Sequence, residues 1–185
     1  MSYLSYSKNF EGVLDLFLRD SKRYLPFAQF IENVMSADSE LSKAQKEMIA
    51  VYVSRLNDCH YCVDSHSCVL NGLGGDKEIV SSIADKSIEN VDKKFKAVLE
   101  FAKKLTLEPA KVSETDVKTV RLAGWSDQTI EDAICVVSVF SCLNRLIDGC
   151  GIKGSKNHFQ EVGGMIAQQG YSPLVQMIAQ KAKTS

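Results

Sequence analysis

The stretch EMIAVYVSRLNDCHYCVDSH, residues 47–66, determines most of what can be inferred about this chain. It begins with Glu47 ahead of an apolar run and ends with Cys59, Cys62 and His66. If the chain is helical from the first cysteine onward, the two thiols and the imidazole fall at i, i+3 and i+7 and share one helix face. Two thiols and an imidazole on one face can form a redox site or most of a metal site.

The chemistry expected of these residues follows from their positions. Free N–H groups at a helix N-terminus lower the pKa of a thiol placed there, and Cys59 and Cys62 are expected in such a first turn. Their spacing lets either cysteine resolve an oxidised form of the other as a disulfide. His66 lies one turn further on and can take or relay a proton. Glu47 precedes an apolar run, so we expect it to turn into the core and act as a base.

Helical periodicity continues through the rest of the chain. Apolar residues recur at helical spacing, and capping residues, glycines and prolines mark the ends of the segments. The expected helices cover residues 9–19, 26–35, 43–56, 59–72, 76–84, 95–105, 113–123, 126–148, 157–169 and 173–181. Pro26 is expected in the first turn of the second helix, and Ser42 with Gln45 as a capping box of the third. Segment 126–148 is apolar nearly all round, which predicts a buried central helix. No run has strand character, so the sequence predicts one compact all-α domain over residues 1–185.

Composition narrows the class of protein. The chain has 185 residues, 45% of them hydrophobic and 24% charged, with a net charge of −1, as in an ordinary soluble domain. This balance gives no reason to expect binding to nucleic acid or to a membrane. The N-terminal residues lack the pattern of a secretory signal, and the longest apolar run, 134–143, is about half a membrane span. Six cysteines without such a signal indicate reduced thiols, and hence a cytoplasmic protein.

Several other residues have simpler interpretations. Four cysteines have no partner at useful spacing and are expected as small buried hydrophobes, namely Cys68, Cys135, Cys142 and Cys150. Tyr61 and Trp125 are expected to be packing residues. Asn144 and Arg145 interrupt an apolar segment, which indicates either a buried polar network or a subunit contact.

The order Glu47, eleven residues, Cys59, two residues, Cys62, three residues, His66 resembles the signature of alkylhydroperoxidase D-like proteins in the carboxymuconolactone decarboxylase superfamily. The wider chain is similar to the peroxidase-related branch of that superfamily. The similar segments are Leu41-Ser42, FAKKLTLEPAKVS at 101–113, LAGWSDQTIEDA at 122–133 and FSCLNRLIDGCGI at 140–152. His60 and Cys68 depart from the pattern inside the motif region.

The resemblance implies an all-helical fold that assembles into trimers or hexamers, and a peroxidase that cycles through a disulfide. Cys62 would attack the hydroperoxide, Cys59 would resolve the sulfenic acid and donate a proton, and Glu47 and His66 would relay protons. Helix-dipole reasoning alone favours Cys59 as the nucleophile, whereas the closeness of His66 favours Cys62. An external dithiol, either a thioredoxin-like or a lipoyl-bearing protein, would restore the thiols. The sequence has no flavin, nicotinamide or phosphate-binding signature, so no cofactor is expected.

Three alternatives use the same stretch differently. A general thiol–disulfide oxidoreductase would act on protein disulfides with the same residues. A lyase like the decarboxylase that names the superfamily would not require the paired cysteines. A zinc-binding interaction protein would use Cys59, Cys62, His66 and Glu47 as ligands, but structural zinc sites usually add a second Cys/His pair, and only His158 remains elsewhere. We therefore expect no metal.

Overall fold

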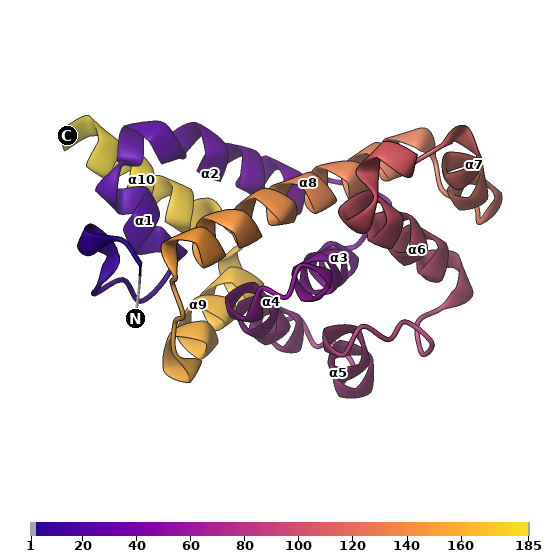
Figure 1. Ribbon diagram of the computed structural model, residues 1–185, viewed down its shortest axis with the longest axis horizontal. Helices are drawn as coiled ribbons and strands as arrows, with labels where there is room; N and C mark the ends of the chain where they lie inside the picture. The colour runs from indigo at the N-terminus through magenta and orange to yellow at the C-terminus, as the bar shows by residue number, and fades with distance from the viewer. Residues whose placement is uncertain (1–2, 185) are drawn as a thin grey trace.

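Helices alone build the computed structural model, which describes residues 3–184 (Figure 1). Within these residues the chain forms ten α-helices and two short 3-10 helices, with no strand, which confirms the all-α prediction. The elements are η1 Ser5–Ser7, α1 Val13–Arg19, α2 Ser21–Ser36, α3 Lys43–Leu56, α4 His60–Gly72, α5 Lys77–Ala84, α6 Lys93–Leu107, η2 Pro109–Lys111, α7 Glu114–Leu122, α8 Asp127–Cys150, α9 Lys156–Gln169 and α10 Ser172–Thr184.

The α3–α4 hairpin lies at the centre of the fold. The predicted capping box of Ser42 and Gln45 opens α3, with each side chain accepting from the other residue's backbone N–H. Asn57 closes α3, and Asp58 has a left-handed φ of 56°, a conformation that a short polar side chain tolerates. The N–H of Cys59 then donates to the carbonyl of Ser54 at 2.9 Å, so the chain reverses within three residues. Helix α4 therefore folds back onto α3.

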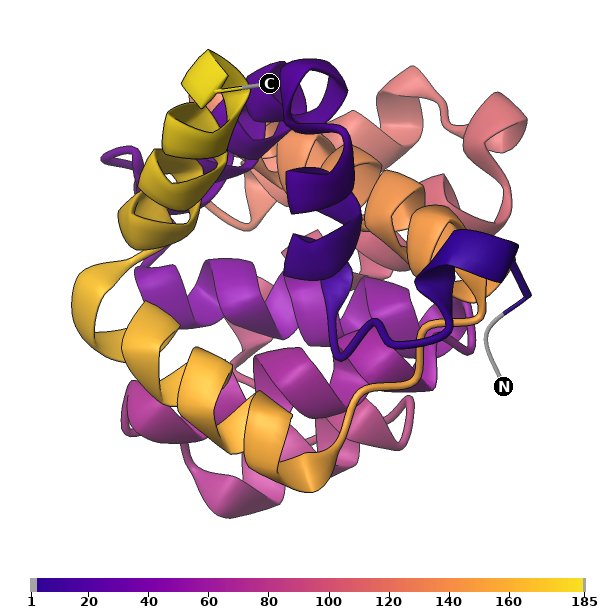
Figure 2. The same cartoon turned by 90° about the vertical axis from the view of Figure 1, so that its left-hand side faces the viewer.

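The other helices surround this hairpin. Helix α8 crosses α3 and α6, while α9 packs along α4 (Figure 1). Gly163 permits the close approach of α9, because a Cβ there would lie 2.7 Å from the Cβ of Cys68. Helices α1, α2 and α10 pack together and form a cover at one end of the molecule (Figure 2). The cover and the hairpin enclose the space in which the site lies.

Two predicted helix boundaries are wrong. The first helix begins at Val13 rather than at residue 9, because the side chain of Asp15 accepts from the N–H groups of Glu11 and Gly12 and caps it there. The second helix begins at Ser21, since the side chain of Asp20 accepts from the N–H of Arg23. Pro26 therefore lies inside α2 rather than in its first turn. Tertiary packing of α2 against α10 outweighs the backbone hydrogen bond that a proline lacks.

Helix α8 is less buried than its composition predicts. It is long and apolar enough to cross a membrane, and half of its most apolar window is buried inside the protein. One stripe of α8 is exposed and carries Glu131, Ile134, Ser138, Cys142 and Arg145. The prediction of an all-round buried helix is therefore correct for one face only.

Candidate active site

The two cysteines of the motif lie at the N-terminus of α4. Cys59 is the N-cap residue, one position before the predicted first turn, and its carbonyl accepts from the N–H of Val63 at 3.1 Å. Cys62 lies in the first turn. Both side chains are buried, with exposed fractions of 0% for Cys59 and 3% for Cys62. Cys59 has the largest influence on the pKa of the Cys62 thiol, so the two side chains are neighbours.

The acidity of Cys62 differs from the prediction. Its pKa is raised well above the ordinary thiol value, first by the hydrogen bond with Cys59 and then by burial and the charge of a Cys59 thiolate. A hydrogen bond with the side chain of Asn144 acts in the opposite direction. The expectation that the helix N-terminus makes this thiol acidic is therefore wrong, because desolvation and the neighbouring sulfur outweigh the helix dipole. Cys62 rests as a thiol and needs a base to become reactive.

A base of the expected kind is present nearby. Glu47, 3% exposed, turns into the core as predicted, and its Oε2 lies 2.8 Å from Nδ1 of the buried His66. The ring of His66 also packs edge-on against Phe140, with 4.6 Å between the ring centroids. The structure thus brings together the carboxylate of α3 and the imidazole of α4, as the motif spacing suggested.

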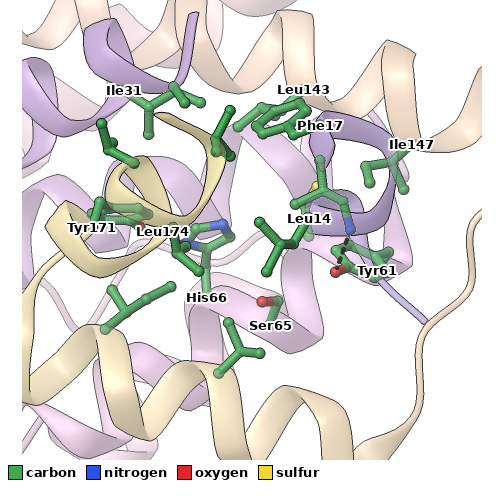
Figure 3. Close-up of a pocket in the computed structure, with 17 residues that line it drawn as sticks. Leu14, Phe17, Ile31, Tyr61, Ser65, His66, Leu143, Ile147, Tyr171 and Leu174 are labelled. Carbon is green, nitrogen blue, oxygen red and sulfur yellow. Dashed lines mark hydrogen bonds between the residues drawn. The ribbon is translucent and has the colours of Figure 1, made fainter. Parts of the chain in front are cut away.

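Tyr171 completes this group, and the sequence analysis missed it. Its hydroxyl donates to Oε1 of Glu47 at 2.6 Å. The same hydroxyl lies 3.4 Å from Nδ1 of His66, and Figure 3 shows the two side chains beside each other. Tyr171 follows Gly170 between α9 and α10, far from the motif in sequence, and no periodicity or spacing singles it out. We call Glu47, His66 and Tyr171 the ionic cluster.

An apolar cavity of about 70 Å³ lies between the cover and α4 (Figure 3). Cys62, His66 and Tyr171 line it, together with apolar side chains from α1, α2, α8, α9 and α10. Cys59 does not line it. No lysine or arginine is among the lining residues. A small, largely apolar molecule in this cavity would therefore meet the sulfur of Cys62 but not that of Cys59.

A second group of polar side chains stabilises the cysteine turn, the reversal between α3 and α4 that ends at Cys59. The amide of Asn144 on α8 donates to Oγ of Ser54 at 3.0 Å and accepts from the amide of Asn57 at 2.9 Å. We call Ser54, Asn57 and Asn144 the amide cluster. Asn144 thus belongs to a buried polar network, one of the two interpretations of the sequence. Arg145 does not, because it is exposed and donates to the carbonyl of Ser141.

Tyr61 does more than pack. Its hydroxyl accepts from the N–H of Val13 at 3.1 Å, which ties the start of α1 to the cysteine turn, and its ring packs edge-on against Phe159. Burial raises the pKa of Tyr61 to about 12, so it stays a neutral phenol. Trp125 is buried as predicted, and its indole N–H donates to the carbonyl of Lys94.

The four remaining cysteines lie outside the site. The expectation that they are small buried hydrophobes is wrong, because Cys68, Cys135 and Cys150 are only half-buried and Cys142 is exposed. In the part of the chain that the structure describes, no three side chains of His, Cys, Asp or Glu gather in a way that could hold a metal ion.

Comparison with known proteins points to one family. The model of the carboxymuconolactone decarboxylase family matches residues 24–104, which include α3, α4 and all four predicted site residues. The solved structure of a peroxidase-related protein from Silicibacter sp. TM1040 is 28% identical to this chain, with a TM-score of 0.75 over 80% of this chain and 78% of the other.

Two further relatives are more distant. A peroxidase-related protein from Ralstonia eutropha JMP134, described as an alkylhydroperoxidase AhpD core, is 24% identical, with a TM-score of 0.74 over 80% of this chain and 78% of the other. The uncharacterized protein YdfG of Bacillus subtilis (strain 168) is 21% identical over 109 residues, which are 58% of this chain and 74% of that protein. This chain is therefore similar to the carboxymuconolactone decarboxylase family over residues 24–104, and its fold is similar to that of solved peroxidase-related proteins.

Proposed function

We propose that this protein is a cysteine-dependent peroxidase that reduces hydroperoxides through a disulfide cycle between Cys62 and Cys59. One observation carries the proposal: Cys62 and His66 line the same apolar cavity, while the neighbouring Cys59 does not line it. A nucleophile, a base and a resolving thiol are thus arranged around a space that admits a small substrate. The peroxidase-related neighbours agree with this chemistry.

The first step consumes the peroxide. His66 takes the proton of the Cys62 thiol, and the thiolate attacks the distal oxygen of the hydroperoxide. The O–O bond breaks, Cys62 becomes a sulfenic acid, and the leaving alkoxide takes the proton from His66 to become an alcohol. Cys62 is oxidised by two electrons and the peroxide is reduced by two.

The second step forms the disulfide and the third removes it. The thiol of Cys59 attacks the sulfenic sulfur of Cys62, an S–S bond forms, and water leaves. An external dithiol, a thioredoxin-like or lipoyl-bearing protein, then exchanges with this disulfide and carries away the two electrons. A reducing compartment such as the cytoplasm suits an enzyme whose resting form is the dithiol.

Access and acidity pull in opposite directions at Cys62. Its raised pKa disfavours the thiolate, but of the two motif cysteines only Cys62 lines the cavity. Once two neighbouring thiols have lost one proton, the remaining proton can pass from one sulfur to the other, so Cys62 can carry the negative charge. A peroxide in the cavity, however, can reach only Cys62, because it must touch the sulfur that it oxidises. We therefore assign the attack to Cys62.

The alternatives lack support in the geometry. A general thiol–disulfide oxidoreductase would use the same two cysteines, but it would not need the apolar cavity that Cys62 lines. A lyase acting on a carboxylated lactone would gain from a cation in its site, and the cavity lining has none. Zinc would need the imidazole, the thiols and the carboxylate to gather around one point, and no such group of His, Cys, Asp or Glu side chains occurs among the residues that the structure describes.

We also propose that the chain assembles into a trimer or hexamer. The fold leaves large apolar side chains on its surface, among them Leu122 with an exposed fraction of 78% and Leu107 with 52%. Burying such side chains between copies removes apolar area from water. Light scattering at micromolar concentration should give a mass of three or six times 20.5 kDa, and a monomer mass would contradict the assembly.

Single-turnover mixing with the two serine variants tests the proposal. Cys59→Ser should consume one equivalent of tert-butyl hydroperoxide and accumulate a sulfenic acid on Cys62, because no neighbouring thiol condenses with it. Cys62→Ser should show no fast reaction. The exposed Cys142 gives the matched control, and Cys142→Ser should react like the parent. Trapping of sulfenic acid on Cys59 of the Cys62→Ser variant, at the parent's rate, would reverse the assignment.

A further inference from the structure

We infer that Tyr171 is a positioning residue for the proposed reaction: its hydroxyl holds Glu47 so that His66 carries its proton on Nδ1 and keeps Nε2 free as a base. This inference rests on the proposed function and adds to it a residue that the motif does not contain.

The backbone around Tyr171 is held firmly. Gly170 has a left-handed φ of 70°, and a Cβ there would lie 3.3 Å from Oγ of Ser36, so glycine suits this sharp turn. The carbonyl of Tyr171 accepts from the N–H groups of Leu174 and Val175 and so closes the first turn of α10. These contacts direct the side chain inward, beside His66 at the wall of the cavity (Figure 3).

The protons of the ionic cluster can be assigned from its contacts. The hydroxyl of Tyr171 has one hydrogen, and the nearer acceptor at 2.6 Å is Oε1 of Glu47. An ionised Glu47 has no hydrogen to give, so the 2.8 Å contact between its Oε2 and His66 must use a hydrogen on Nδ1. The neutral imidazole then has its lone pair on Nε2. This is the tautomer that can accept a proton from a thiol.

The same contacts explain why a buried carboxylate is tolerated at this position. Each oxygen of Glu47 has a hydrogen-bond donor, and hydrogen bonds to an ionised group are stronger than those between neutral groups. Without the hydroxyl of Tyr171, Oε1 would have no donor from this cluster. A proton on Glu47 would then be favoured, and a protonated Glu47 would donate to Nδ1 and push the histidine hydrogen to Nε2. His66 would lose its function as a base.

Tyr171 itself is not the acid. Burial and the neighbouring Glu47 raise its pKa well above the ordinary value for a tyrosine, so the phenol stays neutral. Its single hydrogen points at Glu47 rather than at the substrate. Its effect on the reaction therefore passes through Glu47 and His66.

The test combines kinetics with a direct measurement of the tautomer. Tyr171→Phe keeps the ring that lines the cavity and removes the hydroxyl. We expect its single-turnover rate with tert-butyl hydroperoxide to fall about tenfold or more at pH 7, and the acidic limb of its pH profile to move to higher pH. Tyr52→Phe, at a buried tyrosine of α3 that does not line the cavity, is the matched control and should change neither quantity.

Two further measurements separate positioning from a general packing effect. In the Glu47→Gln background, Tyr171→Phe should cause no additional loss of rate, since the two residues act in series. Nitrogen-15 NMR of the reduced, histidine-labelled protein should show hydrogen on Nδ1 of His66 in the parent and on Nε2 in Tyr171→Phe. The signals of the other two histidines, His60 and His158, are identified by their loss in glutamine variants.

The outcomes distinguish the two proposals. An equal loss of rate at every pH, independent losses in the double variant, or a His66 tautomer unchanged by Tyr171→Phe would overturn the positioning role. A parent protein that does not react with hydroperoxide would contradict the proposed function instead. The tautomer measurement needs no activity, so it decides the inference about Tyr171 in either case.

Discussion

The two buried polar clusters on the α3–α4 hairpin differ in chemistry although they share a helix face. Glu47 of the ionic cluster and Ser54 of the amide cluster are seven residues apart on α3, so both side chains point toward the same side, two turns apart. The ionic cluster contains a carboxylate and an imidazole, and two of its members line the cavity. The amide cluster contains no group that titrates at neutral pH and does not reach the cavity.

This difference indicates a division of tasks within one hairpin. Titratable groups at the cavity can exchange protons with a substrate, whereas amides and hydroxyls donate and accept without changing charge. The amide cluster ties α3 and its link to α8 and places an N–H group beside the sulfur of Cys62. Changes in the amide cluster should therefore affect stability first, and changes in the ionic cluster should affect reactivity first.

Asn144→Ala should have the largest effect, on stability. It leaves the hydroxyl of Ser54 and the amide of Asn57 without their partner, and we expect the free energy of unfolding to fall by about 3 kcal/mol. Urea unfolding of the reduced protein measures this loss. Ser138→Ala, on the exposed face of the same helix, is the control and should stay within about 0.5 kcal/mol of the parent. A loss of less than about 1 kcal/mol in the free energy of unfolding of Asn144→Ala would contradict a stabilising role of the amide cluster.

Glu47→Gln should have the next largest effect, on rate. Glutamine can still accept from Tyr171, but its amide donates to Nδ1 of His66 and reverses that hydrogen bond. The first step with hydroperoxide should slow about a hundredfold, which equals about 2.7 kcal/mol in the barrier, while the free energy of unfolding changes little. Stopped-flow mixing and urea unfolding of the same preparation test both statements. If Glu47→Gln lowered both the rate with hydroperoxide and the free energy of unfolding by similar amounts in kcal/mol, the two clusters would not differ in function.

The pH dependence of stability should show the smallest of the three effects. Because folding raises the pKa of Cys62, its contribution to stability is complete below the unfolded-state pKa and is lost as pH rises through the folded-state pKa. Above about pH 9 the reduced parent should therefore lose up to about 1.4 kcal/mol per pH unit more than Cys62→Ser. If the free energies of unfolding of the two proteins change by the same amount from pH 7 to pH 10, the raised pKa of Cys62 is contradicted.

Local rules account for what the sequence predicted correctly. The all-α class and the α3 boundaries follow from periodicity and capping, which act within one or two turns. The burial of Glu47 beside the apolar run, and its meeting with His66 through the short Asn57-Asp58 link, also depend on residues that are near one another in the chain. The boundaries of α1 and α2 were wrong because the caps at Asp15 and Asp20 were not recognised.

The remaining features depended on contacts between distant parts of the chain. Tyr171 and Glu47 are 124 residues apart, and Asn144 and Ser54 are 90 residues apart, so no local pattern could pair them. The position of the cavity, with Cys62 at its wall and Cys59 behind it, depends on how α1 and α10 pack over α4. The sequence by itself determined which helices form and which chemical groups share a turn, because propensity and periodicity are short-range. Only the tertiary structure decided which sulfur is accessible, how acidic it is and what holds its base, because burial and distant hydrogen-bond partners arise only when the helices pack.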